Sequence, residues 1–458
     1  MRLIDRDQES ARLRAASASP PALVIMTGRR RVGKSFLLSQ ALQGPRVVSF
    51  QADQQGESGH LELLSREAAD LIPGAPPLAF PSWTEALAFL EAQARQAPTT
   101  LVLDELQWMC EAQPALPSII QGFWDRWDRE QIPVCLVLCG SAVSFMQGLM
   151  DHGQPLYGRA TYRPLLEPLD YRWAAQFTSQ SDPVELLRRY AVLGGLPQYQ
   201  VWAGDLPVED IISEHVLTKG ASLYSDPLHL LREEEEIRDL GTYFDVLRAV
   251  AEGNTQATRI ASRAKLSMAN TSKKLAVLAR LDYLTVREPL EPRRKARARS
   301  LYVVSDPFMR FWFRYVFPNR SRLDRGRVTD VLQEVLADLD TFMGHAFENC
   351  CRQWVGIHAP DAVVGPIDEL GGWWSRRHDA EIDIVGMHRQ RYTFLGSVKW
   401  RATVDEDVLD QLYEHRARLG APAARARLGL FAREAFTSAV TRRAREEGIT
   451  LMTASDLF

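Results

Sequence analysis

A loop carrying glycine and lysine, between a short apolar run and a helical run, constrains the fold of this 458-residue chain more than any other feature. The run ALVIMTG ends at Gly28, the loop RRRVGKS follows, and FLLSQAL continues with helical character. The order is strand, loop, helix, and the pattern reads GxxxxGKS. Gly28 and Gly33 allow backbone N–H groups to approach phosphate oxygens, and the helix N-terminus adds the positive end of its dipole. The pattern predicts a site for a nucleoside triphosphate.

Two side chains of this loop have distinct predicted tasks. Lys34 is expected to reach the β and γ phosphates and to act in catalysis, while the Ser35 hydroxyl is expected to ligate Mg²⁺. ATP and Mg²⁺ are therefore the expected cofactors. The loop residues expected to line the nucleotide are Gly28, Arg29, Arg30, Arg31, Val32, Gly33, Lys34, Ser35 and Phe36.

Two later apolar runs end in polar side chains that suit the same site. The run TTLVLDELQWM places Asp104 and Glu105 at a strand end. Asp104 is expected to support the metal together with Ser35, and Glu105 is the candidate general base that activates water. The run VCLVLCGS ends in Ser141, which is placed to sense the γ phosphate.

These strand ends also predict the fold around the site. Three parallel-type strands separated by helical segments indicate a doubly wound α/β sheet that binds its ligand at the carboxyl ends of the strands. The chain is too long for one compact core, so we expect two or three domains. Its composition, 46% hydrophobic and 25% charged, is typical of a folded globular protein. The net charge of −3 means that any nucleic-acid or membrane signal must be regional.

The cysteines and the N-terminus indicate a reducing compartment. The five cysteines show no CxxC spacing of a metal pair, and Cys135 and Cys139 lie in an apolar run where buried thiols are expected. The N-terminus has no apolar core for a signal peptide, and no stretch reaches about 18 uncharged apolar residues. We therefore expect a cytoplasmic protein without a membrane partner.

Six segments together resemble prokaryotic AAA-like P-loop ATPases of the archaeal ATPase type, which are related to the signalling ATPases called STAND. The segments are LIDRDQESARL, GRRRVGKS, LVLDELQW, LCGS, PLYGRATYRPLLEPL and LGGLPQY. The resemblance implies that Gly194, Gly195 and Pro197 form a lid turn, although from the residues alone they predict only a tight turn after a helix. It also implies that Arg159 is an arginine finger or a γ-phosphate sensor. The alternative for Arg159 is a salt-bridged loop residue. A finger that acts in trans would require a homo-oligomer.

The middle of the chain predicts a winged helix-turn-helix. Apolar residues at helical spacing indicate helices near 243–251, 256–263 and 269–281, and YLTVREPL and SLYVVSD alternate like two wing strands. The third helix and the basic run between the strands suit base edges and phosphates of duplex DNA. The alternative is a module for domain packing or for a protein partner. The candidate DNA contacts are Asn270, Ser272, Lys273, Lys274, Arg293, Arg294, Lys295, Arg297 and Arg299.

The last third is similar to the restriction-endonuclease-like PD-(D/E)xK arrangement. HAFENCCRQW is a helix-like segment with an acid, and EIDIVGMHRQRYTFLGSVKW reads as a hairpin. Such a centre needs oxygen ligands for Mg²⁺ or Mn²⁺ and a lysine near the scissile phosphate. The candidate residues are Glu348, Glu381, Asp383, Ser397 and Lys399. Ser397 stands where an acid is expected, so we expect nuclease activity that is impaired or absent, unless Glu348 and Glu381 compensate.

The expected division of the chain follows from these segments. We predict an ATPase core over 1–165, a helical lid over 166–238, a winged helix over 239–305 and a nuclease-like α/β domain over 306–458. The leading hypothesis is a switch that binds and hydrolyses ATP and engages DNA. The alternatives are a STAND-like signalling ATPase whose C-terminal domains bind a protein and an ATP-regulated, metal-dependent DNA nuclease.

Overall fold

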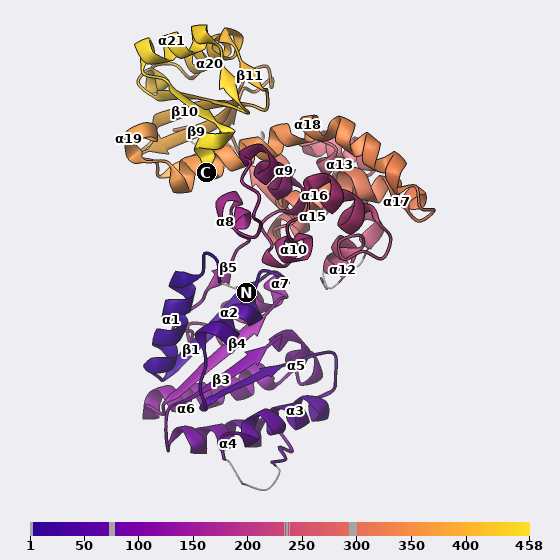
Figure 1. Cartoon of the computed structure of the whole chain (residues 1–458). Helices are drawn as coiled ribbons and strands as arrows, with labels where there is room; N and C mark the ends of the chain where they lie inside the picture. The colour runs from indigo at the N-terminus through magenta and orange to yellow at the C-terminus, as the bar shows by residue number, and fades with distance from the viewer. Residues whose placement is uncertain (1–2, 73–77, 233, 235–236, 238, 293–299) are drawn as a thin grey trace. The chain divides into compact units, whose positions relative to one another are not determined.

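The computed structural model describes residues 3–72, 78–232, 234, 237, 239–292 and 300–458 (Figure 1). Within it the chain divides into two compact units, each with its own core. The first is Met1–Pro168 with Leu196–Gln198, and the second is Leu169–Gly195 with Tyr199–Phe458. The predicted division into four segments is finer than this and stays a prediction.

A parallel sheet of five strands forms the centre of the first unit, so this part of the chain has an α/β fold. Its order is β2-β3-β4-β1-β5. The interior strands β1, β3 and β4 are buried along their whole length, which is why they appear in the sequence as continuous apolar runs. The strands are β1 (Ala22–Gly28), β2 (Val47–Gln51), β3 (Thr99–Asp104), β4 (Val134–Gly140) and β5 (Leu165–Leu166).

Helices cover both faces of this sheet. Leu23 and Ile25 of β1 share a core cluster with residues of α3, α4 and α6, whereas α1 and α2 pack against each other and against β1. Side chains of a strand alternate between the faces, so each buried strand contributes to both layers. The helices are α1 (Asp7–Ala18), α2 (Lys34–Ala41), α3 (Glu57–Ala69), α4 (Trp83–Ala94), α5 (Leu106–Ala112), α6 (Leu116–Glu130) and α7 (Val143–Gly148).

The second unit begins with short helices. Gly194 follows α9 with φ 68°, as the tight turn predicted there requires. The helical segments are α8 (Tyr171–Ala175), α9 (Pro183–Leu193), α10 (Pro197–Ala203), α11 (Val208–Asp210), the π-helical η1 (Ile211–Leu217) and α12 (Asp226–Arg232).

Three helices and a two-stranded antiparallel sheet follow at the predicted places. The helix bounds differ from the predicted ones by only a few residues, and β6 pairs with β7 from Leu284 opposite Val304 to Arg287 opposite Leu301. The basic residues Arg293, Arg294, Lys295, Arg297 and Arg299 lie outside the described residues. The elements are α13 (Leu240–Ala251), α14 (Ala257–Ala264), α15 (Met268–Arg280), β6 (Leu284–Arg287) and β7 (Leu301–Val304).

An aromatic segment then leads into the longest helix. Phe308, Phe311, Trp312 and Phe313 are fully buried, so the aromatic-rich stretch serves as core. The elements are α16 (Pro307–Phe311), the π-helical η2 (Trp312–Val316), α17 (Phe317–Leu323) and α18 (Val328–Gln353).

A mixed sheet with the order β14-β12-β10-β9-β8 closes the chain. The strands β9 and β10 form the predicted hairpin, and Arg389 and Gln390 in its turn have positive φ values of 49° and 62°. Helix α20 packs on both hairpin strands. The elements are η3 (Trp354–His358), α19 (Asp361–Val364), β8 (Glu369–Trp374), β9 (Glu381–His388), β10 (Arg391–Lys399), β11 (Thr403–Val404), α20 (Glu406–Leu419), η4 (Ala421–Ala423), β12 (Arg427–Ala432), β13 (Ala435–Phe436), α21 (Ser438–Glu447), β14 (Thr450–Thr453) and η5 (Ala454–Leu457).

Two chain-wide expectations concern thiols and membrane spans. Cys135 and Cys139 are buried, as predicted, and they carry no disulfide. Among the helices that the structure describes, none has both the length and the hydropathy needed to cross a membrane.

Candidate functional site

The phosphate-binding loop joins β1 to α2 at the carboxyl edge of the parallel sheet. Gly33 has φ 95° and is followed directly by α2, which begins without a side-chain cap. The first backbone N–H groups of an uncapped helix are open to an anion. At Gly28 a Cβ would stand 2.8 Å from the Leu166 carbonyl oxygen, so glycine is required there. The loop therefore has the backbone form that a phosphate cradle needs.

Lys34 lies inside this loop. Its side chain is buried, and its Nζ donates to the carbonyl oxygens of Gly28 at 2.8 Å and of Arg29 at 3.2 Å. Both partners are neutral, so the lysine charge is held in place without being cancelled. An anion in the loop would supply the missing counter-charge.

Ser35 and Asp104 meet across two elements. Ser35 Oγ donates to Asp104 Oδ2 at 2.5 Å, and the backbone N–H of Glu105 donates to Asp104 Oδ1 at 2.9 Å. Asp104 is buried at the end of β3. A hydroxyl and a carboxylate are the oxygen donors that Mg²⁺ prefers, so this pair fits the expected metal.

Glu105 is held at the ends of β3 and β4. It has the left-handed backbone conformation φ 57°, ψ 49°, which is unusual for a residue with a side chain and recurs at functional sites. Its Oε2 accepts from the Ser141 backbone N–H at 3.1 Å and from Ser141 Oγ at 2.7 Å. The predicted base and the predicted γ-phosphate sensor are thus direct partners.

Gln107 completes this contact and was not predicted from the sequence. Its Nε2 donates to Glu105 Oε2 at 2.6 Å and to Ser141 Oγ at 3.2 Å. The available signal was its position two residues after Glu105, in the first turn of α5, where a side chain can turn back to the strand end.

Gln107→Leu tests whether this amide positions Glu105. We expect kcat for ATP hydrolysis to fall about tenfold, because loosening a catalytic group by a fraction of an ångström has effects of this order. KM for ATP should change little, since Gln107 donates to Glu105 and Ser141, which both lie outside the loop. Steady-state kinetics provides the measurement, with Gln113→Leu, at the other end of α5, as the control. A parallel rise in KM would instead place Gln107 in binding.

Arg159 forms an ion pair in the first unit. Its Nε and Nη2 donate to Asp125 Oδ1 and Oδ2 at 2.6 and 2.9 Å, and this contact lowers the pKa of Asp125. This ion pair is the arrangement expected if Arg159 is a salt-bridged loop residue. A role as finger or sensor stays a prediction and requires that the pair with Asp125 open.

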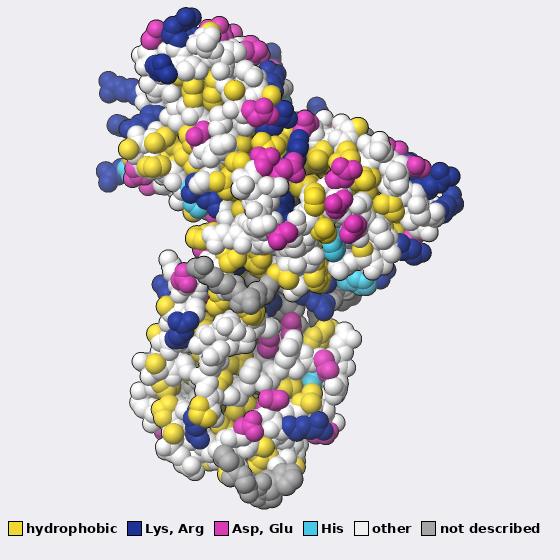
Figure 2. Space-filling model, in the orientation of Figure 1, with side chains coloured by type: hydrophobic (Ala, Val, Ile, Leu, Met, Phe, Trp, Pro, Cys, Tyr) yellow, Lys and Arg dark blue, Asp and Glu magenta, His cyan; other side chains and the backbone are white. Residues whose placement is uncertain are grey.

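The third helix of the middle segment carries the described candidate DNA contacts. Asn270, Ser272 and Lys273 are exposed on α15. Lys274 is turned inward, with Nζ 4.1 Å from the centre of the Tyr243 ring and 3.8 Å from Asp239 Oδ2. On the face drawn in Figure 2, Lys and Arg side chains are spread over both units rather than gathered in one patch. The overall charge of this face therefore does not mark a site for DNA, so the candidate contact rests on the side chains of α15 itself.

The hairpin of the last third brings Asp383 and Ser397 together. Asp383 Oδ2 accepts from Ser397 Oγ at 3.2 Å and from the Val398 backbone N–H at 2.7 Å, and Lys399 Nζ lies 4.0 Å from the same oxygen. Burial, followed by the charge of Glu348, raises the pKa of Asp383. The serine thus occupies the side of the aspartate on which a second acid would stand.

Glu348 is engaged by two arginines. Its Oε1 accepts from Arg287 Nη1 of β6 at 3.1 Å and from Arg352 one turn along α18. Arg352 also donates to the Asp383 carbonyl oxygen at 2.9 Å. The charge of Glu348 is therefore balanced within the protein. The contact with Arg287 was not predicted from the sequence.

A cleft of about 260 Å³ opens beside this hairpin. Burial, with Asp383 and Glu348 nearby, raises the pKa of Glu381 to about 7. Helix α20 adds Gln411 and His415, which the sequence analysis missed, and His415 Nδ1 lies 2.6 Å from the Glu381 carbonyl oxygen. Gln411 and His415 are one helical turn apart in the segment after the hairpin, and this spacing could have indicated them from the sequence. The lining comprises His378, Asp379, Ala380, Glu381, Asp383, Ser397, Lys399, Gln411, Leu412 and His415.

The residues of this centre do not fit a divalent metal as they stand. Within the described part of the chain, no three His, Cys, Asp or Glu side chains converge as a metal-binding group. Ser397 places a neutral hydroxyl beside Asp383, and Glu348 already pairs with two cations. The compensation by Glu348 and Glu381 considered from the sequence is not formed in this arrangement.

This chain therefore carries a phosphate-binding loop at the carboxyl edge of a parallel α/β sheet. A protein of Methanocaldococcus jannaschii described as uncharacterized is 24% identical over 409 residues, which cover 88% of this chain and 89% of that protein. The family model DUF234, archaea bacterial proteins of unknown function, matches residues 312–410.

Two solved structures are similar to this chain at low sequence identity. The Walker-type ATPase of Pyrococcus abyssi is 19% identical, with a TM-score of 0.49 over 68% of this chain and 96% of that chain. The ORC2 protein of Aeropyrum pernix, in ADPNP and ADP complexes, is 15% identical, with a TM-score of 0.46 over 73% of this chain and 96% of that chain.

Proposed function

We propose that this protein binds and hydrolyses ATP and that the nucleotide state acts as a switch on its C-terminal segments. The observation that carries the proposal is the hydrogen bond between Ser35 Oγ and Asp104 Oδ2, which joins the phosphate loop to the metal-side acid. In this proposal α2 and the loop amides bind the phosphates, and Lys34 turns from the loop carbonyls to them. Bound Mg²⁺ would neutralise phosphate charge.

Glu105 is the proposed base in this scheme. Ser141 and Gln107 hold its carboxylate at the strand ends, where it can accept a proton from an attacking water. Because Ser141 contacts Glu105 directly, a γ phosphate near Ser141 would alter the position of the base. The test is ATP turnover by the purified chain with Mg²⁺ and after chelation with EDTA. Turnover that is absent with Mg²⁺, or unchanged by EDTA, contradicts the proposal.

We propose further that residues 239–305 form a winged helix that engages duplex DNA. The observations that favour DNA are the exposed Asn270, Ser272 and Lys273 on α15 and the basic sequence between β6 and β7. A helix carrying amide and lysine side chains suits base edges and phosphates of a major groove. Lys274 is left out of the proposed contact because it packs on Tyr243.

The double variant Asn270→Ala/Lys273→Gln tests the DNA contact. We expect about tenfold weaker binding to a fluorescent duplex at low salt, and a salt slope smaller by about 1, because one phosphate contact is lost. Anisotropy titrations at three salt concentrations provide the measurement. Lys274→Gln is the matched control, since it removes the same charge from an inward-facing side chain. Equal behaviour of the two variants contradicts the contact.

The nuclease-like hairpin is proposed to be inactive in cleavage. Linear and supercoiled DNA incubated with the protein and Mn²⁺ should show no more cleavage than with Lys399→Ala, because the oxygen ligands of a metal are incomplete. Cleavage by the wild type that Lys399→Ala abolishes would favour the ATP-regulated nuclease.

The remaining organisation is also a proposal. The lid over 166–238, a cytoplasmic location and self-association through Arg159 rest on the resemblance of the sequence segments. Light scattering that gives the molecular mass of a monomer both with and without ATP contradicts self-association. A signalling ATPase with a protein partner remains the alternative, and it predicts turnover that does not respond to DNA.

A further inference from the structure

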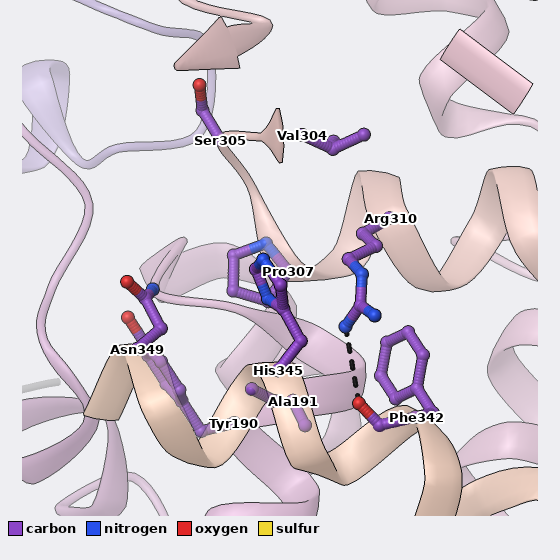
Figure 3. A pocket seen from close by; sticks show the side chains of 10 residues that line it. Tyr190, Ala191, Val304, Ser305, Pro307, Arg310, Phe342, His345 and Asn349 are labelled. Carbon is purple, nitrogen blue, oxygen red and sulfur yellow. Dashed lines mark hydrogen bonds between the residues drawn. The ribbon is translucent and has the colours of Figure 1, made fainter. Parts of the chain in front are cut away.

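A small cavity lies within the second unit, away from the hairpin cleft (Figure 3). It has a volume of about 20 Å³, above the roughly 10–15 Å³ that one water molecule needs, so it suits a compact occupant. Four elements supply its walls: α9, the end of β7, α16 and α18. The lining residues are Tyr190, Ala191, Val304, Ser305, Pro307, Arg310, Phe342, His345, Ala346 and Asn349.

Arg310 brings a positive charge to this cavity, and the charge of Glu348 acts on it without forming an ion pair. Its Nη1 donates to the Phe342 carbonyl oxygen at 3.2 Å, and its guanidinium lies 4.5 Å from the centre of the Phe342 ring (Figure 3). Among the described residues it forms no ion pair, whereas Arg314, one turn further, pairs with Asp338. Burial lowers the pKa of Arg310 to about 10, so it stays charged near neutral pH. A largely buried cation without an acid partner calls for an anion.

Two further polar side chains of the lining have unused hydrogen-bonding groups. His345 and Asn349 lie one turn apart on α18, and within the described part of the chain neither side chain has a hydrogen-bond partner. Both side chains are partly buried, and polar groups in such positions bind a protein partner, water or a ligand. The Asn349 amide and the ring N–H of a neutral His345 can both donate to an oxyanion.

The charges around the cavity favour the same occupant. Among the described residues that line it, none is Asp or Glu. Burial lowers the pKa of His345, and the charges of Arg310, Arg287 and Arg352 lower it further, which indicates a positive potential at its ring. The nearby acid Glu348 is already paired with Arg287 and Arg352.

We propose that this cavity is a binding site for a compact inorganic anion of the phosphate or chloride class, held by Arg310, His345 and Asn349. A bound anion would link α9, α16 and α18 and so reduce the motion of these three helices relative to one another. The inference does not depend on the nucleotide site.

The experiment is a thermal-unfolding titration with sodium phosphate in a Lys34→Ala background, which weakens phosphate binding by the nucleotide loop. Phosphate should raise the melting temperature progressively, since a ligand of the folded state stabilises it. Arg310→Met should weaken apparent phosphate affinity at least about tenfold, the usual size of a lost charge-assisted contact. Arg322→Met, which removes an exposed arginine paired with Glu334, is the matched control and should leave the affinity unchanged.

A second variant guards against misfolding of Arg310→Met. Asn349→Leu keeps the arginine, has the same branched arrangement of heavy atoms as asparagine and removes the amide donor, so it should also weaken phosphate affinity. A chloride titration distinguishes the two anions, and a response to either supports the site. Sodium gluconate at equal ionic strength is the reference, because its anion is too large for the cavity. A response to gluconate equal to that of phosphate and chloride, or a response retained in both Arg310→Met and Asn349→Leu, overturns the proposal.

Discussion

Lys34→Ala is expected to weaken ATP binding about a hundredfold. The lysine charge is buried in the loop against two neutral carbonyl oxygens, so it is available to a phosphate, and a charge-assisted hydrogen bond contributes about 1.5–3 kcal/mol. Binding of a fluorescent ATP analogue with Mg²⁺, followed by titration, gives the dissociation constant directly.

The control for Lys34→Ala removes a cation elsewhere on the same unit. Arg66→Ala removes an exposed arginine paired with Glu62 on α3 and should leave the dissociation constant unchanged. Both variants should unfold cooperatively, since the Lys34 head group contacts only the loop. Unchanged ATP affinity in a folded Lys34→Ala protein would remove the loop from the nucleotide site.

Glu105→Gln is expected to lower kcat about a hundredfold or more and to leave ATP binding intact. The amide keeps the size of the side chain and can still accept from Ser141, but it cannot accept a proton from water. Single-turnover hydrolysis separates this effect from product release.

A matched change on the following helix controls for Glu105→Gln. Glu111→Gln alters an exposed glutamate of α5 by the same atoms and should leave turnover unchanged. If Glu105→Gln turns over ATP as fast as the wild type, another group is the base. If it loses binding as well, Glu105 supports the nucleotide rather than the chemical step.

The sequence predicted the centre of the first unit because its signals are local. The strands β1, β3 and β4 are interior and entirely apolar, so they stand out as runs, and the site residues follow them directly. The strands β2 and β5 were missed. Edge strand β2 alternates buried and exposed residues over only five positions, and β5 has two residues, so neither forms a distinct run.

The contacts that were missed depend on tertiary structure. Arg287 and Glu348 are 61 positions apart, and the sequence shows neither that the strand β6 reaches α18 nor that the acid is already paired. Gln107 is close to Glu105 in sequence, but its direction depends on the left-handed backbone of Glu105. Residue types thus indicated which groups belong to the sites, whereas their partners required the fold.

Steady-state ATP hydrolysis by the wild type, measured with Mg²⁺ at low and high salt and with and without duplex DNA, tests the switch most directly. We predict turnover that Glu105→Gln abolishes and that DNA stimulates at low salt, with the stimulation fading as salt screens the phosphate contacts. Turnover no higher than that of Glu105→Gln under every condition would contradict the account.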